Sequence, residues 1–313
     1  MVPDNGFNLY VGDQQMINLQ IARLQLRIDN PQAEITFGLP TCHKKFLQPL
    51  VAPQAVFLKK KNELHKSLSS VLNITIIDQS PFPPPQEVSP VYRSTSWELW
   101  QLEKDCYLLT SPVHFPDRKL IFDNRFTLGS VIDNFSTKYK DGCYPLEYLD
   151  IRLFSIWLAS FGDLILHASG VEMDGRGYAF LGTSGAGKST LAAELQKNNA
   201  VTVLGEDQVI LRYIDGAFWI FGTPWHMTPS MCSPKGVKLK KLFFLNRYEK
   251  TGLKQLSPIV GMAQILQTAF IPYHFSEDVP LILDRLSLLS EKVPFYSLSY
   301  KLGTDPLPYI SGK

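Results

Sequence analysis

The sequence lacks the features by which several classes of protein are recognised. No apolar run approaches the roughly 18–20 residues that a membrane helix needs, and the opening residues, MVPDNGFNLYVGDQQ, have neither the basic start nor the apolar stretch of a signal peptide. The four cysteines form no CxxC or CxxxC pair, which argues against a structural zinc site and a disulfide scaffold. The formal net charge of +2 is too balanced for a nucleic-acid footprint. We therefore expect a soluble, cytoplasmic protein with no nucleic-acid partner and no membrane partner.

The chain is too long for one average domain. Its 313 residues exceed the roughly 100–150 of a typical domain. A content of 45% hydrophobic and 19% charged residues is typical of globular proteins. The strongest break in composition is the segment 80–90, where five prolines fall within eleven residues. Because proline lacks the amide donor that helices and central strands need, this segment is predicted to be a loop or spacer.

The first half of the chain is rich in β-forming residues. Short runs of such residues, separated by turn residues, predict strands at residues 73–77, 97–102, 106–110 and 119–123. One helix is predicted over residues 57–72. We expect residues 1–144 to form an N-terminal, mostly β (α+β) domain that serves substrate or partner recognition.

The hydrophobic period changes at Pro145. Apolar residues recur at spacings of three and four between Pro145 and Gly162, which predicts a helix. Strands and a helix are then predicted in alternation at residues 164–173, 178–181, 188–198 and 201–204. Strand, loop, helix, strand is the pattern of α/β nucleotide-binding domains. Residues 145–313 are therefore expected to form an α/β nucleotide-binding domain.

A glycine-rich loop lies between the second of these strands and the helix. Its sequence GTSGAGKS matches the Walker A, or P-loop, pattern G-x-x-x-x-G-K-[ST]. The glycines let successive backbone N–H groups point inward at a phosphate, and the helix N-terminus adds its partial positive charge. Lys188 would bridge the β- and γ-phosphates, and the Ser189 hydroxyl would ligate Mg²⁺. The residues expected to bind nucleotide are Gly182, Thr183, Ser184, Gly185, Ala186, Gly187, Lys188, Ser189 and Thr190.

Two adjacent acids follow the next strand. Phosphoryl transfer uses a base beside the attacking hydroxyl or water and a carboxylate on the metal, and Glu206 and Asp207 could supply both. On a true strand their side chains would point to opposite faces, so one must lie on a loop or bulge if both act. We assign Glu206 to the base and Asp207, with Ser189, to the metal, although the two acids could exchange roles.

A histidine completes the pattern. His167 stands fifteen residues before Gly182. With the loop and the acidic pair, it makes the segment from His167 to Arg212 resemble the catalytic domain of HPr kinase/phosphorylase. The resemblance implies a P-loop domain of HPr-kinase type and ATP-dependent transfer of the γ-phosphoryl group to a hydroxyl, with serine the expected acceptor. It implies a catalytic role for His167, Lys188, Glu206 and Asp207, with His167 donating to the phosphoryl group or orienting the base.

The chain departs from that family in two places. The first acid is glutamate where the family typically has aspartate, and the glycine-rich stretch that contacts HPr is missing. We therefore expect the acceptor to be another peptide or protein, or a small molecule, rather than HPr. A phosphate-binding loop does not distinguish adenine from guanine, so the nucleotide could be GTP instead of ATP.

Other interpretations stay open. The same residues would suit a P-loop NTPase or a nucleotide-sensing module without kinase activity, because a hydrolase also needs an acid on Mg²⁺. His226 could line the pocket. The oligomeric state is undetermined and a homo-oligomer is compatible with the sequence. Four lysines could close over phosphates from a mobile loop or form a solvated face, namely Lys235, Lys238, Lys240 and Lys241.

Overall fold

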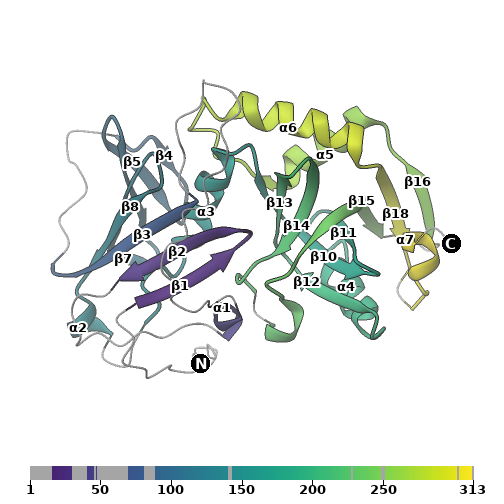
Figure 1. Cartoon of the computed structure of the whole chain (residues 1–313), viewed down its shortest axis with the longest axis horizontal. Coiled ribbons are helices and arrows are strands. Elements are labelled where there is room, and N and C mark those ends of the chain that lie inside the picture. Colours follow the sequence, from purple (N-terminus) through teal and green to yellow (C-terminus); the bar gives the residue numbers. More distant parts are fainter. Residues whose placement is uncertain are drawn as a thin grey trace. The chain divides into compact units, whose positions relative to one another are not determined.

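The structure is a computed structural model with a mixed α/β fold that contains two large sheets (Figure 1). It describes residues 16–29, 41–45, 47, 70–80, 89–139, 143–226, 228–247, 251–301 and 303–311. The chain divides into two compact units, Met1–Leu153 and Phe154–Lys313. The predicted boundary between residues 144 and 145 falls earlier, ahead of helix α3 (Asp150–Ala159), and stays a prediction. Among the described residues, no helix is long and apolar enough to cross a membrane.

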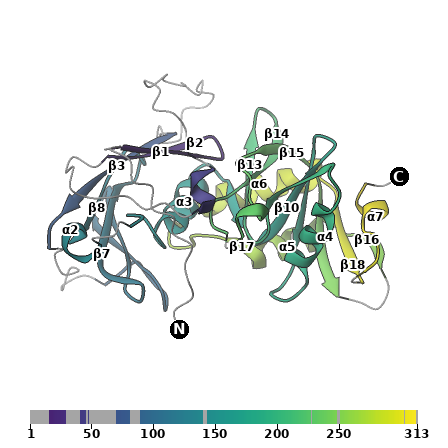
Figure 2. The ribbon, with the colours of Figure 1, turned by 90° about the horizontal axis from the view of Figure 1, so that it is seen from below.

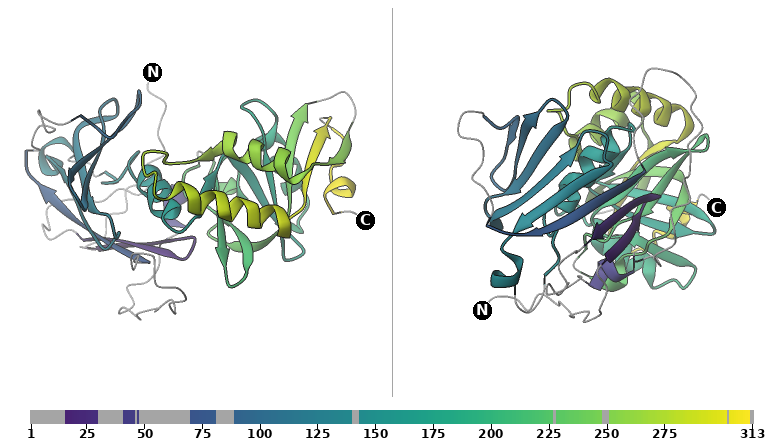
Figure 3. Two further views of the ribbon diagram at one scale, coloured as in Figure 1. Left: turned by 90° about the horizontal axis from the view of Figure 1, so that it is seen from above. Right: turned by 60° about the vertical axis from the view of Figure 1, so that its left-hand side comes forward.

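The first unit is built on an eight-stranded sheet within the described ranges (Figure 3, right). The spatial order is β1 (Met16–Ile21), β2 (Leu24–Asp29), β3 (Val71–Asp78), β8 (Leu128–Asp133), β7 (Phe115–Asp123), β6 (Cys106–Ser111), β5 (Glu98–Glu103) and β4 (Tyr92–Arg93). Strand β3 pairs in parallel with both β2 and β8, and the other neighbours are antiparallel. Two short helices accompany it, α1 (Thr41–Lys44) and α2 (Phe135–Lys138).

The four strands predicted in this unit are confirmed as β3, β5, β6 and β7. The helix predicted over 57–72 lies mostly outside the described residues, and its last two residues begin strand β3 instead. Most of the proline-rich segment, residues 81–88, also lies outside them.

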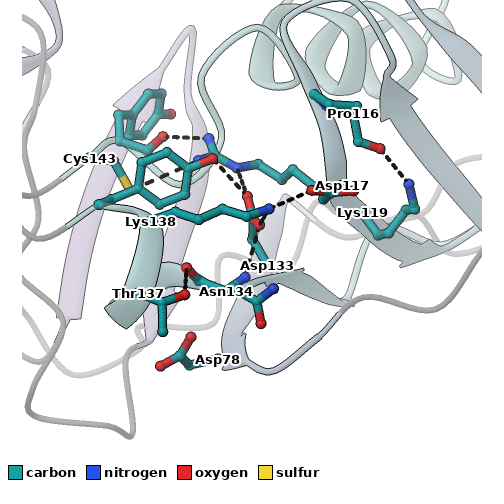
Figure 4. Close-up of polar contacts among 12 residues, drawn as sticks. Asp78, Pro116, Asp117, Lys119, Asp133, Asn134, Thr137, Lys138 and Cys143 are labelled. Atoms are coloured by element: carbon teal, nitrogen blue, oxygen red, sulfur yellow. Dashed lines mark hydrogen bonds and ion pairs between the residues drawn. The ribbon is translucent and has the colours of Figure 1, made fainter.

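A charged cluster is buried where β7, β8 and α2 meet. The Arg118 side chain is fully buried, and its Nε donates to Oδ2 of the equally buried Asp133 over 3.2 Å. The guanidinium lies over the Phe115 ring, 3.9 Å from its centroid. Lys138 Nζ reaches both Asp133, at 3.1 Å, and Asp117, at 2.6 Å (Figure 4). A buried ion pair whose remaining groups are hydrogen-bonded is costly to break, so this cluster joins the three elements.

The second unit is built on a ten-stranded sheet among the described residues. Its spatial order is β12 (Val201–Gly205), β10 (Ala168–Met173), β11 (Arg176–Leu181), β15 (Gly236–Arg247), β14 (Ala217–Gly222), β13 (Val209–Ile214), β9 (Leu164–Leu166) and β17 (Ala269–Phe270). Off this path, β18 (Phe295–Tyr300) pairs with β15 in parallel, and β16 (Gly252–Gln255) pairs with β18. The helices are α4 (Lys188–Gln196), α5 (Pro258–Thr268), α6 (Val279–Lys292) and α7 (Leu307–Ser311), with a 3-10 turn at Pro229–Met231.

Helices cover this sheet on both faces. Helix α4 lies against β10 and β12 (Figure 2), whereas α5 and α6 lie side by side across other strands (Figure 3, left). Strand β11 shows the division, because Tyr178 and Phe180 pack into the cluster that contains α4 residues, and Ala179 and Leu181 pack into the cluster that contains α5 and α6 residues. Such period-two burial on both faces explains the continuous apolar run of this strand.

One prediction for this unit is wrong, and one open alternative is decided. Residues 164–173 form two strands rather than one, because β9 pairs with β13 and β17 whereas β10 pairs with β11 and β12. The chain changes partners at His167. The lysine-rich segment is largely strand β15 rather than a mobile loop. Its alternation explains this, since Val237 and Leu239 are buried while Lys238 and Lys240 are exposed.

One histidine of this unit is expected to make the free energy of unfolding depend on pH. Burial lowers the pKa of His274 to about 4, whereas an unfolded histidine titrates near pH 6.5. Between these values the unfolded chain binds the extra proton, so the free energy of unfolding falls as the pH is lowered through that window. We expect His274→Gln to reduce the loss between pH 7 and pH 5 by roughly 1 kcal/mol, allowing for partial exposure.

The measurement is urea unfolding at both pH values, compared with His114→Gln, which removes an exposed histidine. Equal pH dependence in all three proteins would refute the assignment.

Candidate functional site

The glycine-rich loop turns sharply between β11 and α4. Gly185 has φ +78° and Gly187, which caps the helix N-terminus, has φ +99°. Both angles lie in the left-handed region, where a side chain is strained. A Cβ on Gly182 would lie 3.0 Å from the Leu245 carbonyl oxygen at the end of the neighbouring strand. The glycines therefore allow both the backbone path and its close approach to β15.

The Lys188 side chain lies inside this loop and forms hydrogen bonds with it. Its side chain is buried, and its Nζ donates to the carbonyl oxygens of Gly182, at 2.8 Å, and Thr183, at 3.2 Å. It also lies 3.1 Å from His167 Nε2. Burial lowers the pKa of Lys188, and the negative charge of Asp207 opposes that shift. The ammonium group thus joins the loop to the histidine at the β9–β10 break.

His167 connects the lysine to the acidic turn. Its backbone N–H donates to the Thr268 carbonyl over 2.9 Å, and its Nδ1 lies 3.2 Å from Asp207 Oδ1. Because an ammonium group only donates, Nε2 accepts, and Nδ1 carries the proton toward Asp207. Burial lowers the pKa of His167; Asp207 opposes the shift and the Lys188 cation reinforces it. The imidazole is therefore neutral at pH 7.

The acidic pair lies in a bend after β12, as two cooperating carboxylates require. Asp207 is engaged with His167 and is 46% exposed. Within the described part of the chain, no group forms a hydrogen bond or ion pair with the Glu206 carboxylate. The Glu206 carbonyl oxygen accepts from Ser169 Oγ at 2.5 Å and from Ser189 Oγ at 3.4 Å. One carboxylate is thus oriented by a histidine, and its neighbour is uncommitted.

The structure gathers most of the predicted site residues. Lys188, His167 and Asp207 form a continuous chain, and Ser189 lies beside the acidic turn. The side chains of Thr183, Ser184 and Thr190 are exposed. Their roles in binding stay predictions, as do those of the loop residues Gly182, Gly185, Ala186 and Gly187.

Sequence reasoning missed two hydroxyl residues and left a third residue open. Ser169 was overlooked, although it stands two residues after His167 on a strand. Thr223 was also overlooked, and only the folded chain shows it beside the turn, where its Oγ1 donates to the Gln208 carbonyl over 2.9 Å. His226, the residue left open, lies beside Thr223, with its Nε2 2.9 Å from Thr223 Oγ1 and 2.7 Å from where a Cβ on Gly205 would be.

The oxygen donors present suit a magnesium ion that is bound together with nucleotide. Ser189 offers a hydroxyl and Asp207 a carboxylate, and both are accessible. Among the described residues, no group of three or more histidine, cysteine, aspartate or glutamate side chains could hold a metal by itself. Mg²⁺ is usually held by one or two carboxylates plus substrate phosphates rather than by an all-protein cage. The residues therefore fit Mg²⁺ only as a partner of phosphates.

Comparison with known proteins gives little further guidance. No protein-family model and no curated protein matches the chain. One solved structure that matches is the Hpr(Ser) kinase/phosphatase from Coxiella burnetii, with 13% identity and a TM-score of 0.28. The match covers 47% of this chain and 86% of that chain. Similarity at this level does not carry function across, so function is inferred below from the chain's own residues.

Proposed function

We propose that this protein is an ATP-dependent kinase that transfers a γ-phosphoryl group to a hydroxyl of a peptide, protein or small molecule, with serine the expected acceptor. The observation that supports this best is the chain from Lys188 through His167 to Asp207. It links a loop of phosphate-binding sequence to a pair of carboxylates, the two parts that phosphoryl transfer needs.

The residues divide the work as follows. The loop amides bind the β- and γ-phosphates, and Lys188 turns from its loop carbonyls to the phosphate oxygens. Ser189 and Asp207 would hold Mg²⁺, which neutralises phosphate charge when bound. Glu206 takes the proton of the acceptor hydroxyl. The acceptor oxygen forms a bond to the γ-phosphorus, while the bond between that phosphorus and the β,γ-bridging oxygen breaks and ADP leaves. His167 keeps Asp207 oriented through its Nδ1–H.

The remaining roles are also proposals. We assign recognition of the acceptor to residues 1–144, which lie outside the site described above. The cytoplasm is the proposed setting, since it supplies Mg·ATP. GTP and a homo-oligomeric state stay open.

The test is a transfer assay with ATP labelled at the γ-phosphate. The purified chain is incubated with Mg·ATP and with pools of serine-, threonine- and tyrosine-containing peptides, and separately with free serine and other small hydroxyl compounds. Label in an acceptor supports the kinase. Release of labelled phosphate without transfer would indicate an NTPase, and nucleotide binding without either would indicate a sensing module.

The roles of the two acids can be distinguished by replacing each carboxylate with its amide. We expect Glu206→Gln to bind Mg·ATP normally and to lose about 10²–10⁴-fold in transfer rate, because it removes only the base. Asp207→Asn is expected to weaken the dependence of ATP binding on Mg²⁺. Calorimetric titration with ATP, with and without Mg²⁺, and a single-turnover transfer assay distinguish the two variants. The control is Glu194→Gln, at the far end of α4. The opposite pattern would exchange the two roles.

A further inference from the structure

Two buried hydroxyl groups hold the acidic turn from opposite sides. Ser169 on β10 is fully buried, and its Oγ donates to the carbonyl oxygen of Glu206 over 2.5 Å. Thr223, just after β14, is also fully buried, and its Oγ1 donates to the carbonyl oxygen of Gln208 over 2.9 Å. These carbonyls are those of the residues immediately before and after Asp207. The backbone is thus fixed on both sides of the residue that carries the carboxylate.

The Thr223 contact is itself supported by a histidine. Its hydroxyl has one proton, which goes to Gln208, so His226 Nε2, at 2.9 Å, must donate to the threonine oxygen. The same Nε2 lies against Gly205, where a Cβ would come within 2.7 Å of it. That Cβ would also lie 2.6 Å from the Gln208 carbonyl oxygen, so any side chain at position 205 would displace one of the two partners of Thr223. The turn is therefore built with a glycine at its start and a hydroxyl donor on each side.

Ser189 explains why such anchors matter. In this structure its hydroxyl also donates, weakly, to the Glu206 carbonyl at 3.4 Å. At 3.4 Å this contact is at the limit of a hydrogen bond, and a Ser189 oxygen that ligates a magnesium ion, as proposed above, is oriented by the metal rather than by the Glu206 carbonyl. Ser169 then remains the donor that holds the Glu206 carbonyl, and Thr223 holds the other side.

We propose that Ser169 and Thr223 are positioning residues that keep the Glu206–Asp207 turn in its productive geometry while Ser189 engages the metal. Neither side chain is placed to touch substrate, and both act through the backbone of the turn. The proposal rests on the proposed kinase function for its effect on rate. Its structural part, that the two hydroxyls immobilise the turn, can be measured without any activity.

The donor-free variants remove the hydroxyl with little change in volume, and the donor-keeping variants change the volume by one methyl group. Ser169→Ala and Thr223→Val lack the hydroxyl, whereas Ser169→Thr and Thr223→Ser retain it, and Ser155→Ala removes a buried hydroxyl from α3 as a control. Hydrogen exchange of the peptide that contains residues 205–208 is compared with that of β18. We expect faster exchange of the turn alone in the two donor-free variants, and near-normal exchange in the other three.

Transfer kinetics give the second readout. The donor-free variants are expected to lose about 10–100-fold in kcat, with the KM for ATP changed less than threefold, because misplaced supporting groups affect the reacting geometry more than binding. The double variant should lose less than the product of the single effects. If one variant fails to fold, the other still tests the turn from the other side of Asp207.

The outcomes separate the two proposals. Unchanged exchange at the turn in the donor-free variants overturns the positioning role, whatever the activity. Faster exchange with an unchanged kcat in an active enzyme overturns its link to catalysis. A wild-type protein that transfers no phosphate, yet whose turn exchanges faster in these variants, refutes the kinase and leaves the anchoring intact.

Discussion

The variant Lys188→Ala is expected to lose measurable binding of Mg·ATP and to transfer phosphate at least roughly 10²–10³-fold more slowly than the wild type. Its ammonium group is buried inside the loop, where it donates to two loop carbonyls and meets His167. In a site of low polarity, such a charge interacts with phosphate far more strongly than in water. Its removal therefore affects both the bound nucleotide and the charge that develops during transfer.

The fold should tolerate this change better than the function does. Alanine leaves two loop carbonyls without the lysine donor, but it also removes a charge whose burial is unfavourable, and these effects oppose each other. We expect the melting temperature without nucleotide to change by only a few degrees. The measurements are calorimetric titration with Mg·ATP and a thermal melt with and without nucleotide.

A lysine on the same element gives the matched control. Lys197 follows the last turn of α4, and its side chain is 72% exposed and paired with Glu194. Lys197→Ala should bind nucleotide like the wild type. Lys188→Arg should not restore binding, because a planar guanidinium does not fit the position of a compact ammonium group. Normal titration heat from Lys188→Ala would remove the basis for any phosphate site at this loop.

The sequence predicted the parts of the site that are encoded in contiguous residues. The loop is readable because glycines at fixed spacing precede a lysine and a helix-forming segment, and the structure places a sharp turn there. The acidic pair was predicted to need a loop or bulge, and it lies in a bend. The break at His167 was not predicted, since periodicity along one segment does not reveal which neighbour each half of a strand will pair with.

Contacts between distant segments could not be predicted in the same way. Ser169 and Thr223 meet the acidic turn only because the start of β10 and the end of β14 lie beside it, and no local pattern distinguishes them from other buried hydroxyl residues. The lysine-rich segment was different, because the alternation of Val237 and Leu239 with lysines was visible and favours a strand. The sequence left a mobile loop and a solvated face open for these lysines, and the structure shows a strand whose Lys238 and Lys240 side chains are exposed.

The variant Asp133→Ala is expected to destabilise the first unit by about 3–5 kcal/mol, because it leaves the buried Arg118 guanidinium without its counter-ion. The Asp133 carboxylate accepts four hydrogen bonds. The donors are Arg118 Nε at 3.2 Å, Lys138 Nζ at 3.1 Å, the Tyr139 hydroxyl at 3.0 Å and the backbone N–H of Asn134 at 2.8 Å. Both carboxylate oxygens are thus used. The loss is measured as the change in the free energy of unfolding, from the hydrogen exchange of peptides in β7 and β8 at increasing urea concentration.

Asp117 supplies the comparison, because it binds the same lysine from the surface. Its carboxylate lies 2.6 Å from Lys138 Nζ but is 57% exposed, so Asp117→Ala should cost less than about 1 kcal/mol. The double variant Arg118→Met with Asp133→Leu removes both buried charges, and it should be closer to the wild type than Asp133→Ala is. If Asp117→Ala and Asp133→Ala lowered the free energy of unfolding by the same small amount, burial would not determine how much this cluster stabilises the first unit. The stability of that unit would then depend on its apolar core alone.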